Sequence, residues 1–135
     1  MPTSRILVSS GTDFESTVGY SRAVRVGSHV VVAGTTGPGA PGDIGAQTRE
    51  ALRRIEIALN EAGASLDDVI RTRIYVTDIS RWHEVAVVHA EVFGHIRPAA
   101  TMVEVRALIA PELLVEIEAD AYSPSTGNVP SAAGR

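Results

Sequence analysis

The feature that most restricts the fold is the order in which strand and helix periodicities follow one another along the chain. Apolar residues recur at helical spacing through residues 44–62, up to Gly63, and through residues 82–96, up to Arg97-Pro98. Alternating runs typical of strands occupy residues 5–10, two arms of a hairpin within 20–34, and residues 69–76, 101–108 and 113–121. This β-β-β-α-β-α-β-β order predicts an α+β domain in two layers, with one mixed six-stranded sheet and two helices on one of its faces.

Strand alternation also predicts which side chains face the helices. In the last two strands the predicted inward residues are Thr101, Val103, Val105 and Ala107, then Leu113, Val115, Ile117, Ala119 and Ala121. The opposite face of the sheet would carry Arg71, Arg73, Tyr75, Met102, Glu104, Arg106, Leu114, Glu116, Glu118 and Asp120. That face is too charged for a core, yet apolar residues interrupt it, so the pattern indicates a subunit interface.

The size and composition of the chain fit one domain without a membrane or nucleic-acid partner. The 135 residues are 44% hydrophobic, which suits a single domain over residues 1–122, followed by a small, polar tail (123–135) predicted to be disordered. A net charge of −4 and the absence of a Lys/Arg-rich run argue against nucleic acid as a partner. No apolar run approaches the ~20 residues of a membrane span and no signal peptide is evident, so we expect no membrane partner and a cytoplasmic protein.

Two patterns that suggest a bound cofactor fail on stereochemistry. The segment GPGAPG (residues 37–42) fits a dinucleotide-binding fingerprint, but Pro38 and Pro41 have no N–H group to offer a phosphate. His83, His89 and His95 are six residues apart, a rotation of about 240° on a helix, so they cannot share a metal. For His89 the sequence favours a packed histidine at the core edge or an interface over a functional one. The absence of cysteine excludes thiol catalysis and thiolate metal sites.

Three acidic residues, Glu116, Glu118 and Asp120, share one face of the last strand. Like charges this close raise at least one carboxyl pKa unless cations intervene, and Arg71, Arg73 and Arg106 are available as cations. The residues alone leave two interpretations open, a salt-bridged sheet face and a catalytic carboxylate.

Five segments taken together resemble the RidA (YjgF) family of reactive-intermediate deaminases. They are GYSRAV, VVVAGTTG, QTREALRRIEIALNEAGASLDDVIRTRIYVTDI, PAATMVEV and VEIEADA. The resemblance covers almost the whole chain and implies a chorismate-mutase-like fold, assembled as a homotrimer with ligand clefts between subunits. It also implies hydrolysis of 2-imino or enamine acids to 2-oxo acids and ammonia, without a metal or organic cofactor.

Carried over by position, the resemblance gives Glu116 as the water-orienting catalytic residue and places Tyr20 and Gly34 in the cleft. Two positions depart from the deaminase pattern, since Ala86 replaces an asparagine of the cleft and Met102 replaces a cysteine. Tyr20, Gly34 and Met102 all belong to the predicted substrate-binding residues.

The most consequential departure is at Ala100, where the deaminases have an arginine. A guanidinium holds both oxygens of a substrate carboxylate in one plane, which alanine cannot do. Arg97, three residues away, and Arg73, on another strand, are the candidate replacements, and the sequence does not choose between them or exclude that the clamp is absent.

The sequence therefore predicts an atypical family member with a small-molecule cleft that Arg97, Ala100 and Met102 help to line. Weak or altered imine and enamine hydrolysis is the first hypothesis. The alternative is a non-enzymatic or differently specialised protein that binds a small carbonyl or aromatic metabolite in a less polar cleft.

Overall fold

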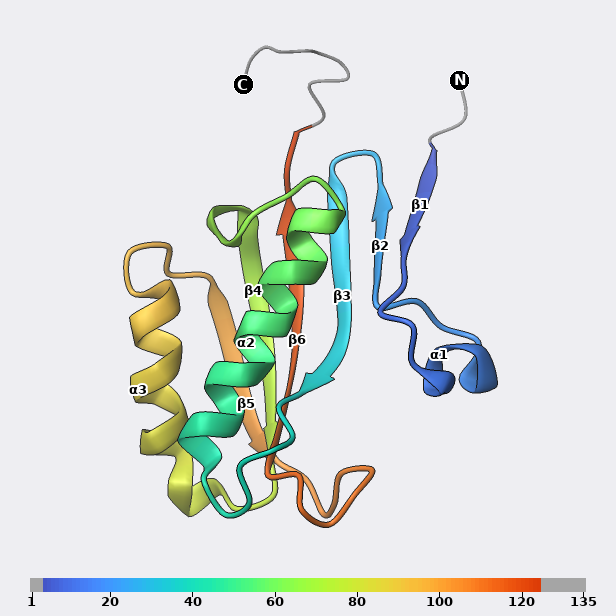
Figure 1. The fold of residues 1–135 in the computed structure, drawn as a ribbon. Coiled ribbons are helices and arrows are strands. Elements are labelled where there is room, and N and C mark those ends of the chain that lie inside the picture. Colours follow the sequence, from blue (N-terminus) through green and yellow to red (C-terminus); the bar gives the residue numbers. More distant parts are fainter. Residues whose placement is uncertain (1–3, 125–135) are drawn as a thin grey trace.

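The computed structural model describes residues 4–124, which form one sheet and three helices (Figure 1). The strands are β1 (Arg5–Val8), β2 (Ala23–Val26), β3 (His29–Thr36), β4 (Val69–Val76), β5 (Ala99–Glu104) and β6 (Val115–Tyr122). The helices are α1 (Asp13–Val18), α2 (Ile44–Glu61) and α3 (Trp82–Phe93), and single 3-10 turns precede β4 (Leu66–Asp68) and α3 (Ile79–Arg81). Within residues 4–124, no helix is long and apolar enough to cross a membrane.

The six strands form one mixed sheet in the order β1-β2-β3-β6-β4-β5. Only β4 and β5 run parallel, because α3 carries the chain from the end of one to the start of the other. Both α2 and α3 cover the same face of the sheet (Figure 1), and the face away from them is called the open face below. The predicted α+β architecture and both predicted helices are confirmed.

The core lies between α2 and the middle of the sheet. Ile55 and Leu59 of α2 and Val115 and Ile117 of β6 are fully buried. The burial repeats every third or fourth residue on the helix and every second residue on the strand, as the sequence pattern predicts. The helix ends before Gly63, whose φ of 80° is a left-handed conformation that favours glycine.

A buried amide, Gln47, joins two loops to α2. Its Nε2 donates to the carbonyl oxygens of Ala40 (3.0 Å) and Glu112 (3.1 Å), and its Oε1 accepts from the backbone N–H of Leu114 (2.8 Å). One side chain thus satisfies backbone groups from the loop before α2 and from the connection into β6. Gly37 packs so closely on this helix that a Cβ there would lie 2.1 Å from the Gln47 carbonyl oxygen. Gly37 therefore serves packing, while Gly39 and Gly42 have positive φ angles, in line with an ordinary loop.

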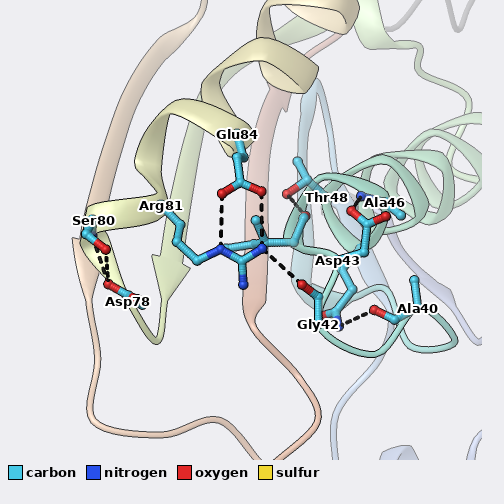
Figure 2. A network of polar contacts seen from close by, with 11 residues as sticks. Ala40, Gly42, Asp43, Ala46, Thr48, Asp78, Ser80, Arg81 and Glu84 are labelled. Atoms are coloured by element: carbon cyan, nitrogen blue, oxygen red, sulfur yellow. Dashed lines mark hydrogen bonds and ion pairs between the residues drawn. The ribbon is translucent and has the colours of Figure 1, made fainter.

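The starts of α2 and α3 are tied together by polar contacts (Figure 2). Asp43 caps α2, its carboxylate accepting from the N–H of Ala46 at 2.9 Å. Arg81, just before α3, donates to the carbonyl oxygen of Gly42 at 3.0 Å and to both carboxylate oxygens of Glu84 at 3.1 Å. Gln47 of α2 and Arg81 just before α3 thus both hold the loop of residues 37–42.

Arg25 fastens the opposite end of the domain. Its guanidinium donates to the carbonyl oxygens of Gly27 (2.9 Å), Ala62 (2.9 Å) and Ser123 (2.7 Å). The N–H of Ser123 also donates to the carbonyl oxygen of Ser28 at 2.8 Å. Hydrogen-bonded structure thus extends to residue 123, one past the predicted domain end. The remainder of the predicted tail, 125–135, lies outside the described residues.

Helix α1 was not predicted. It forms because the carboxylate of Glu15 turns inward and accepts hydrogen bonds from the Ser9 hydroxyl (2.9 Å) and from the N–H and hydroxyl of Ser10. These bonds, that of the Ser10 hydroxyl first, lower the pKa of Glu15. Phe14 and Val18 of the helix are exposed, so it has no apolar stripe that periodicity could reveal.

The predicted orientation of β5 was wrong. Its register sets Ala100, Met102 and Glu104 opposite Thr72, Ile74 and Val76, which face the helices. Accordingly, Met102 packs against the core while Thr101 and Val103 are exposed, and β5 ends before Val105. As the edge strand of the sheet, β5 carries apolar residues on both faces, so alternation alone does not fix its orientation.

Replacing Gln47 with leucine should destabilise the protein strongly. The change leaves three backbone groups near α2 without partners, each worth about 1–3 kcal/mol when buried. We expect a loss of about 3 kcal/mol or more in the free energy of unfolding, measured by urea denaturation. Asn60→Leu, at an exposed position of the same helix, is the control and should change it by less than about 0.5 kcal/mol. Equal effects of the two substitutions would contradict this account of Gln47.

Candidate functional site

The structure brings Glu116 and Gly34 into direct contact. The register of β6 sets Glu116 opposite Thr36 of β3 on one side and Tyr75 of β4 on the other, on the open face. A Cβ built on Gly34 would lie 2.0 Å from Oε2 of Glu116, so only glycine leaves room for this carboxylate. Two of the residues predicted to line the cleft therefore share one spot on the sheet.

An irregularity in β3 creates that spot. The pairing of β3 with β6 shifts between Val32 and Thr35, which leaves Ala33 and Gly34 outside the regular ladder. Arg22 takes up the freed groups: its Nη1 donates to the carbonyl oxygen of Gly34 and to Oγ1 of Thr35, both at 2.8 Å. The guanidinium thereby stabilises the irregular part of β3 that contacts Glu116.

Arg22 also connects this spot to Tyr20. Its Nη2 donates to the Tyr20 hydroxyl at 3.1 Å, and its Cζ lies 5.5 Å from the centroid of the Tyr20 ring, within cation-π range. Tyr20, Arg22, Gly34 and Glu116 form what we call the Glu116 cluster. Sequence reasoning missed Arg22, although it lies two residues after Tyr20 in the quoted segment GYSRAV.

The electrostatics of the cluster suit a proton acceptor. Partial burial, and then the negative charge of Glu118, raise the pKa of Glu116, while Arg22 acts to lower it. A carboxyl whose pKa moves towards neutrality becomes a better general base near pH 7. Tyr75 stands beside it as a neutral phenol, its pKa raised by burial and by Glu118.

The neighbouring acids have a different environment. Nη1 of Arg73 lies 3.4 Å from Oε1 of Glu118 and 3.3 Å from Oδ2 of Asp120, so it pairs with both. Of the two interpretations left open by the sequence, the salt-bridged surface describes Glu118 and Asp120, whereas Glu116 stands apart over Gly34. Arg73, one candidate for the missing clamp, is occupied by these acids.

Ala100 and Met102 do not join the Glu116 cluster within one chain. They lie on the helix-facing side of β5, whereas Glu116 lies on the open face, and β4 separates β5 from β6. The outer edge of β5 pairs with no other strand of the described chain. The predicted site residues therefore fall into two groups, on opposite faces of the sheet.

Arg97 lies at the corner between α3 and β5 in a left-handed conformation, with φ of 60°. Its N–H donates to the carbonyl oxygen of Phe93 at 2.7 Å, which closes the helix, and the following Pro98 disfavours a helical conformation at this residue. Its side chain is exposed and, within residues 4–124, has no hydrogen-bond or ion-pair partner. The cation is therefore on the same edge as Ala100 and is not engaged elsewhere in the described chain.

The three histidines of α3 and its C-terminal turn lie apart. His89 contacts Thr72 of β4, with 2.9 Å between Nε2 and Oγ1, and its ring centroid lies 4.8 Å from that of Phe93. His83 packs edge-on against Trp82, and Nε2 of His95 is 3.9 Å from Asp67. Among the described residues no group of three or more His, Asp or Glu side chains could hold a metal ion.

Comparison with known proteins places the chain in a family. The sequence profile of the family described as Endoribonuclease L-PSP matches residues 10–123. The chain belongs to this family, the RidA (YjgF) family. A RutC family protein of Pyrococcus abyssi is 39% identical over 109 residues, covering 76% of this chain and 85% of its own length. The family relationship thus extends over most of the domain.

Two further comparisons show how similar this RidA family member is to individual relatives. The 3-aminoacrylate deaminase RutC of Acinetobacter baylyi is 40% identical over 81 residues, 60% of this chain and 64% of that protein. The crystal structure of Rv2704 from Mycobacterium tuberculosis, described as a member of the YjgF/YER057c/UK114 family, is 75% identical, with a TM-score of 0.86 over 88% of this chain and 99% of that one. The observed fold is the fold of this family.

Glu116→Gln should remove a pH dependence of stability. Because the folded-state pKa of Glu116 is raised, the native state holds more protons than the unfolded state in the range just above pH 4.5, and stability falls as pH rises through it. The amide does not titrate, so the variant should be more stable than the wild type at pH 7, and this difference should disappear below pH 4.5. Urea unfolding from pH 4 to pH 7.5 measures the difference.

Glu118→Gln, two residues along the same strand, is the matched control. It loses an exposed ion pair with Arg73, so it should not gain stability at pH 7. If Glu116→Gln is instead less stable than the wild type at pH 7 and equal to it at pH 4, the pKa of Glu116 is lowered, and its assignment as a general base loses its support.

Proposed function

We propose that the protein hydrolyses a small imine or enamine, with Glu116 as the base that activates water. The observation that carries the proposal is the Glu116 carboxylate, which lies over Gly34 with a raised pKa while Arg73 pairs with the other two acids. Membership of the RidA family and the similarity to a protein named as a 3-aminoacrylate deaminase support this reaction class.

The reaction follows from these groups. Water, held by Glu116, adds to the imine carbon, and its proton passes to the carboxylate. The carboxyl returns this proton to nitrogen, which gives a carbinolamine. Glu116 then moves the proton of the new hydroxyl to nitrogen, the C–N bond breaks, and ammonia leaves as the carbonyl forms. An enamine first takes a proton on carbon to become the imine. Imine and water are thus converted into a carbonyl compound and ammonia, and Glu116 ends as it began.

A homotrimer is part of the proposal. The Glu116 cluster and the Ala100 edge lie on opposite faces of the sheet, so they can meet only if β5 of one subunit approaches the open face of another. The open face also carries exposed apolar side chains, which a neighbouring subunit would cover: Leu7, Val26, Val31, Val103 and Tyr122. A closed ring of three subunits would bury each of these surfaces in the same way.

The substrate preference follows from Ala100. Without a guanidinium at this position, 2-imino acids lose the contact that fixes their carboxylate, so we propose weak turnover of such acids. Arg97 is the nearest unengaged cation on the same edge of the described chain and is the candidate replacement.

The alternative function is binding without chemistry. Ala100 and Met102 make the β5 side of the proposed cleft less polar than an arginine and a cysteine would, which favours a small carbonyl or aromatic ligand. The ribonuclease activity in the family's description is not carried over, because the net charge is −4 and three acids line the open face.

Glu116→Gln should reduce turnover by about 10²–10⁴-fold, since the amide keeps the shape but cannot accept the proton. The measurement is release of 2-oxo acid from freshly generated 2-iminobutanoate, and from 3-aminoacrylate for the enamine case. Glu118→Gln, on the same strand and face, should retain most of the wild-type rate. Equal rates for Glu116→Gln and the wild type would remove Glu116 from the chemistry. No acceleration over buffer by the wild type would favour the binding alternative.

Val103→Asp should break the trimer. Val103 lies on the open face of the edge strand and is 42% exposed, so a charge there would be buried in the proposed interface. Ile57→Asp is the matched control, because Ile57 is 44% exposed on α2, away from that face. Light scattering at micromolar concentration should give a trimer for the wild type and Ile57→Asp, and a smaller species for Val103→Asp. A monomeric wild type would contradict the proposal.

A further inference from the structure

A histidine lies beside the position of the missing arginine. Ala100 of β5 is the register partner of Thr72 of β4, so their side chains are neighbours on the helix-facing side, about 5 Å apart. The Thr72 hydroxyl in turn lies 2.9 Å from Nε2 of His89, on α3. Thr72 is therefore a neighbour of both the His89 imidazole and Ala100.

Thr72, His89 and Ala100 differ in how accessible they are to solvent. Thr72 is fully buried, His89 is half-buried and Ala100 is exposed, so the alanine and part of His89 remain accessible. The ring is fixed by Thr72 at Nε2 and by Phe93 at 4.8 Å. Within residues 4–124, the other nitrogen, Nδ1, has no hydrogen-bond partner.

We propose that His89 is a specificity-determining residue of the β5 side of the cleft, where its Nδ1 binds an uncharged polar group of the ligand. This inference rests on the proposed intersubunit site and specifies its substrate class. The ligand would be a small carbonyl compound or imine that has an ester, amide or ketone oxygen where the substrates of arginine-bearing relatives have a carboxylate.

The chemistry of imidazole supports this class. Burial lowers the pKa of His89, so the ring is neutral near pH 7 and offers one hydrogen bond at each nitrogen. A neutral single-point partner cannot replace a guanidinium, which binds both oxygens of a carboxylate and neutralises its charge. With alanine at position 100, the edge is matched to a neutral oxygen rather than to an anion.

The test compares two probes that differ in charge and by one methyl group, pyruvate and methyl pyruvate, as analogues of the carbonyl product. Affinities are measured by NMR titration of the full chain. We expect the wild type to bind methyl pyruvate at least fivefold more tightly than pyruvate. His89→Phe should lose about tenfold in affinity for the ester, the value of one neutral hydrogen bond, and His89→Gln should recover part of it. Ala100→Arg should reverse the preference towards pyruvate.

Thermal unfolding and light scattering establish that each variant is folded and assembled like the wild type. If His89→Phe passes both checks and keeps its affinity for the ester, or if the wild type prefers pyruvate, the inference is overturned. His89→Leu, which also removes the hydrogen-bonding nitrogen, provides the same test should the phenylalanine variant misfold.

Binding and turnover measurements together distinguish failure of this inference from failure of the hydrolase proposal. Selective binding that depends on His89, with no imine turnover, would leave the inference standing and remove the enzyme activity. Turnover that depends on Glu116, with ester affinity independent of His89, would do the reverse. Absence of both ester binding and turnover would overturn both.

Discussion

The position of β6 in the middle of the sheet is the constraint on which the rest of the structure depends. It runs antiparallel to both β3 and β4, and its inward residues Val115, Ile117 and Ala119 are fully buried against the helices. The same strand presents Glu116 on its other face. A change in its register by one residue would therefore empty the core and turn the carboxylate inward. Core packing and the chemistry of the cluster are fixed by one set of strand contacts.

The Glu116 cluster also depends on a departure from regular pairing. Where β3 leaves its ladder with β6, backbone carbonyls lose their strand partners, and Arg22 binds one of them. Gly34 can then lie close beneath the carboxylate because it has no side chain. Three residues that are far apart in the sequence thus act as a unit: Arg22 just before β2, Gly34 in β3 and Glu116 in β6.

Periodicity predicted six strands and two helices because those segments bury one regular face. It failed where burial is not regular. Helix α1 is held by hydrogen bonds to Glu15, and β5, at the edge, has apolar residues on both faces, so the side of Ala100 and Met102 was assigned wrongly. Gly34 and Glu116 were paired through the family resemblance rather than by any pattern in the residues. Arg22 was missed because its partners, a backbone carbonyl and the hydroxyls of Tyr20 and Thr35, are uncharged, so no acidic residue in the sequence points to it.

The hydrogen bonds of Arg25 have a consequence for how the sequence of this fold can vary. Its three acceptors are main-chain oxygens of residues 27, 62 and 123, which every amino acid possesses. Substitutions at these positions leave the acceptors in place, so they call for no compensating change at residue 25, and a change at residue 25 finds no compensation in them. A search for correlated substitutions would therefore not detect this contact, even though it joins three distant parts of the chain. In a set of related sequences, such a bond would leave a single unchanging position among variable ones.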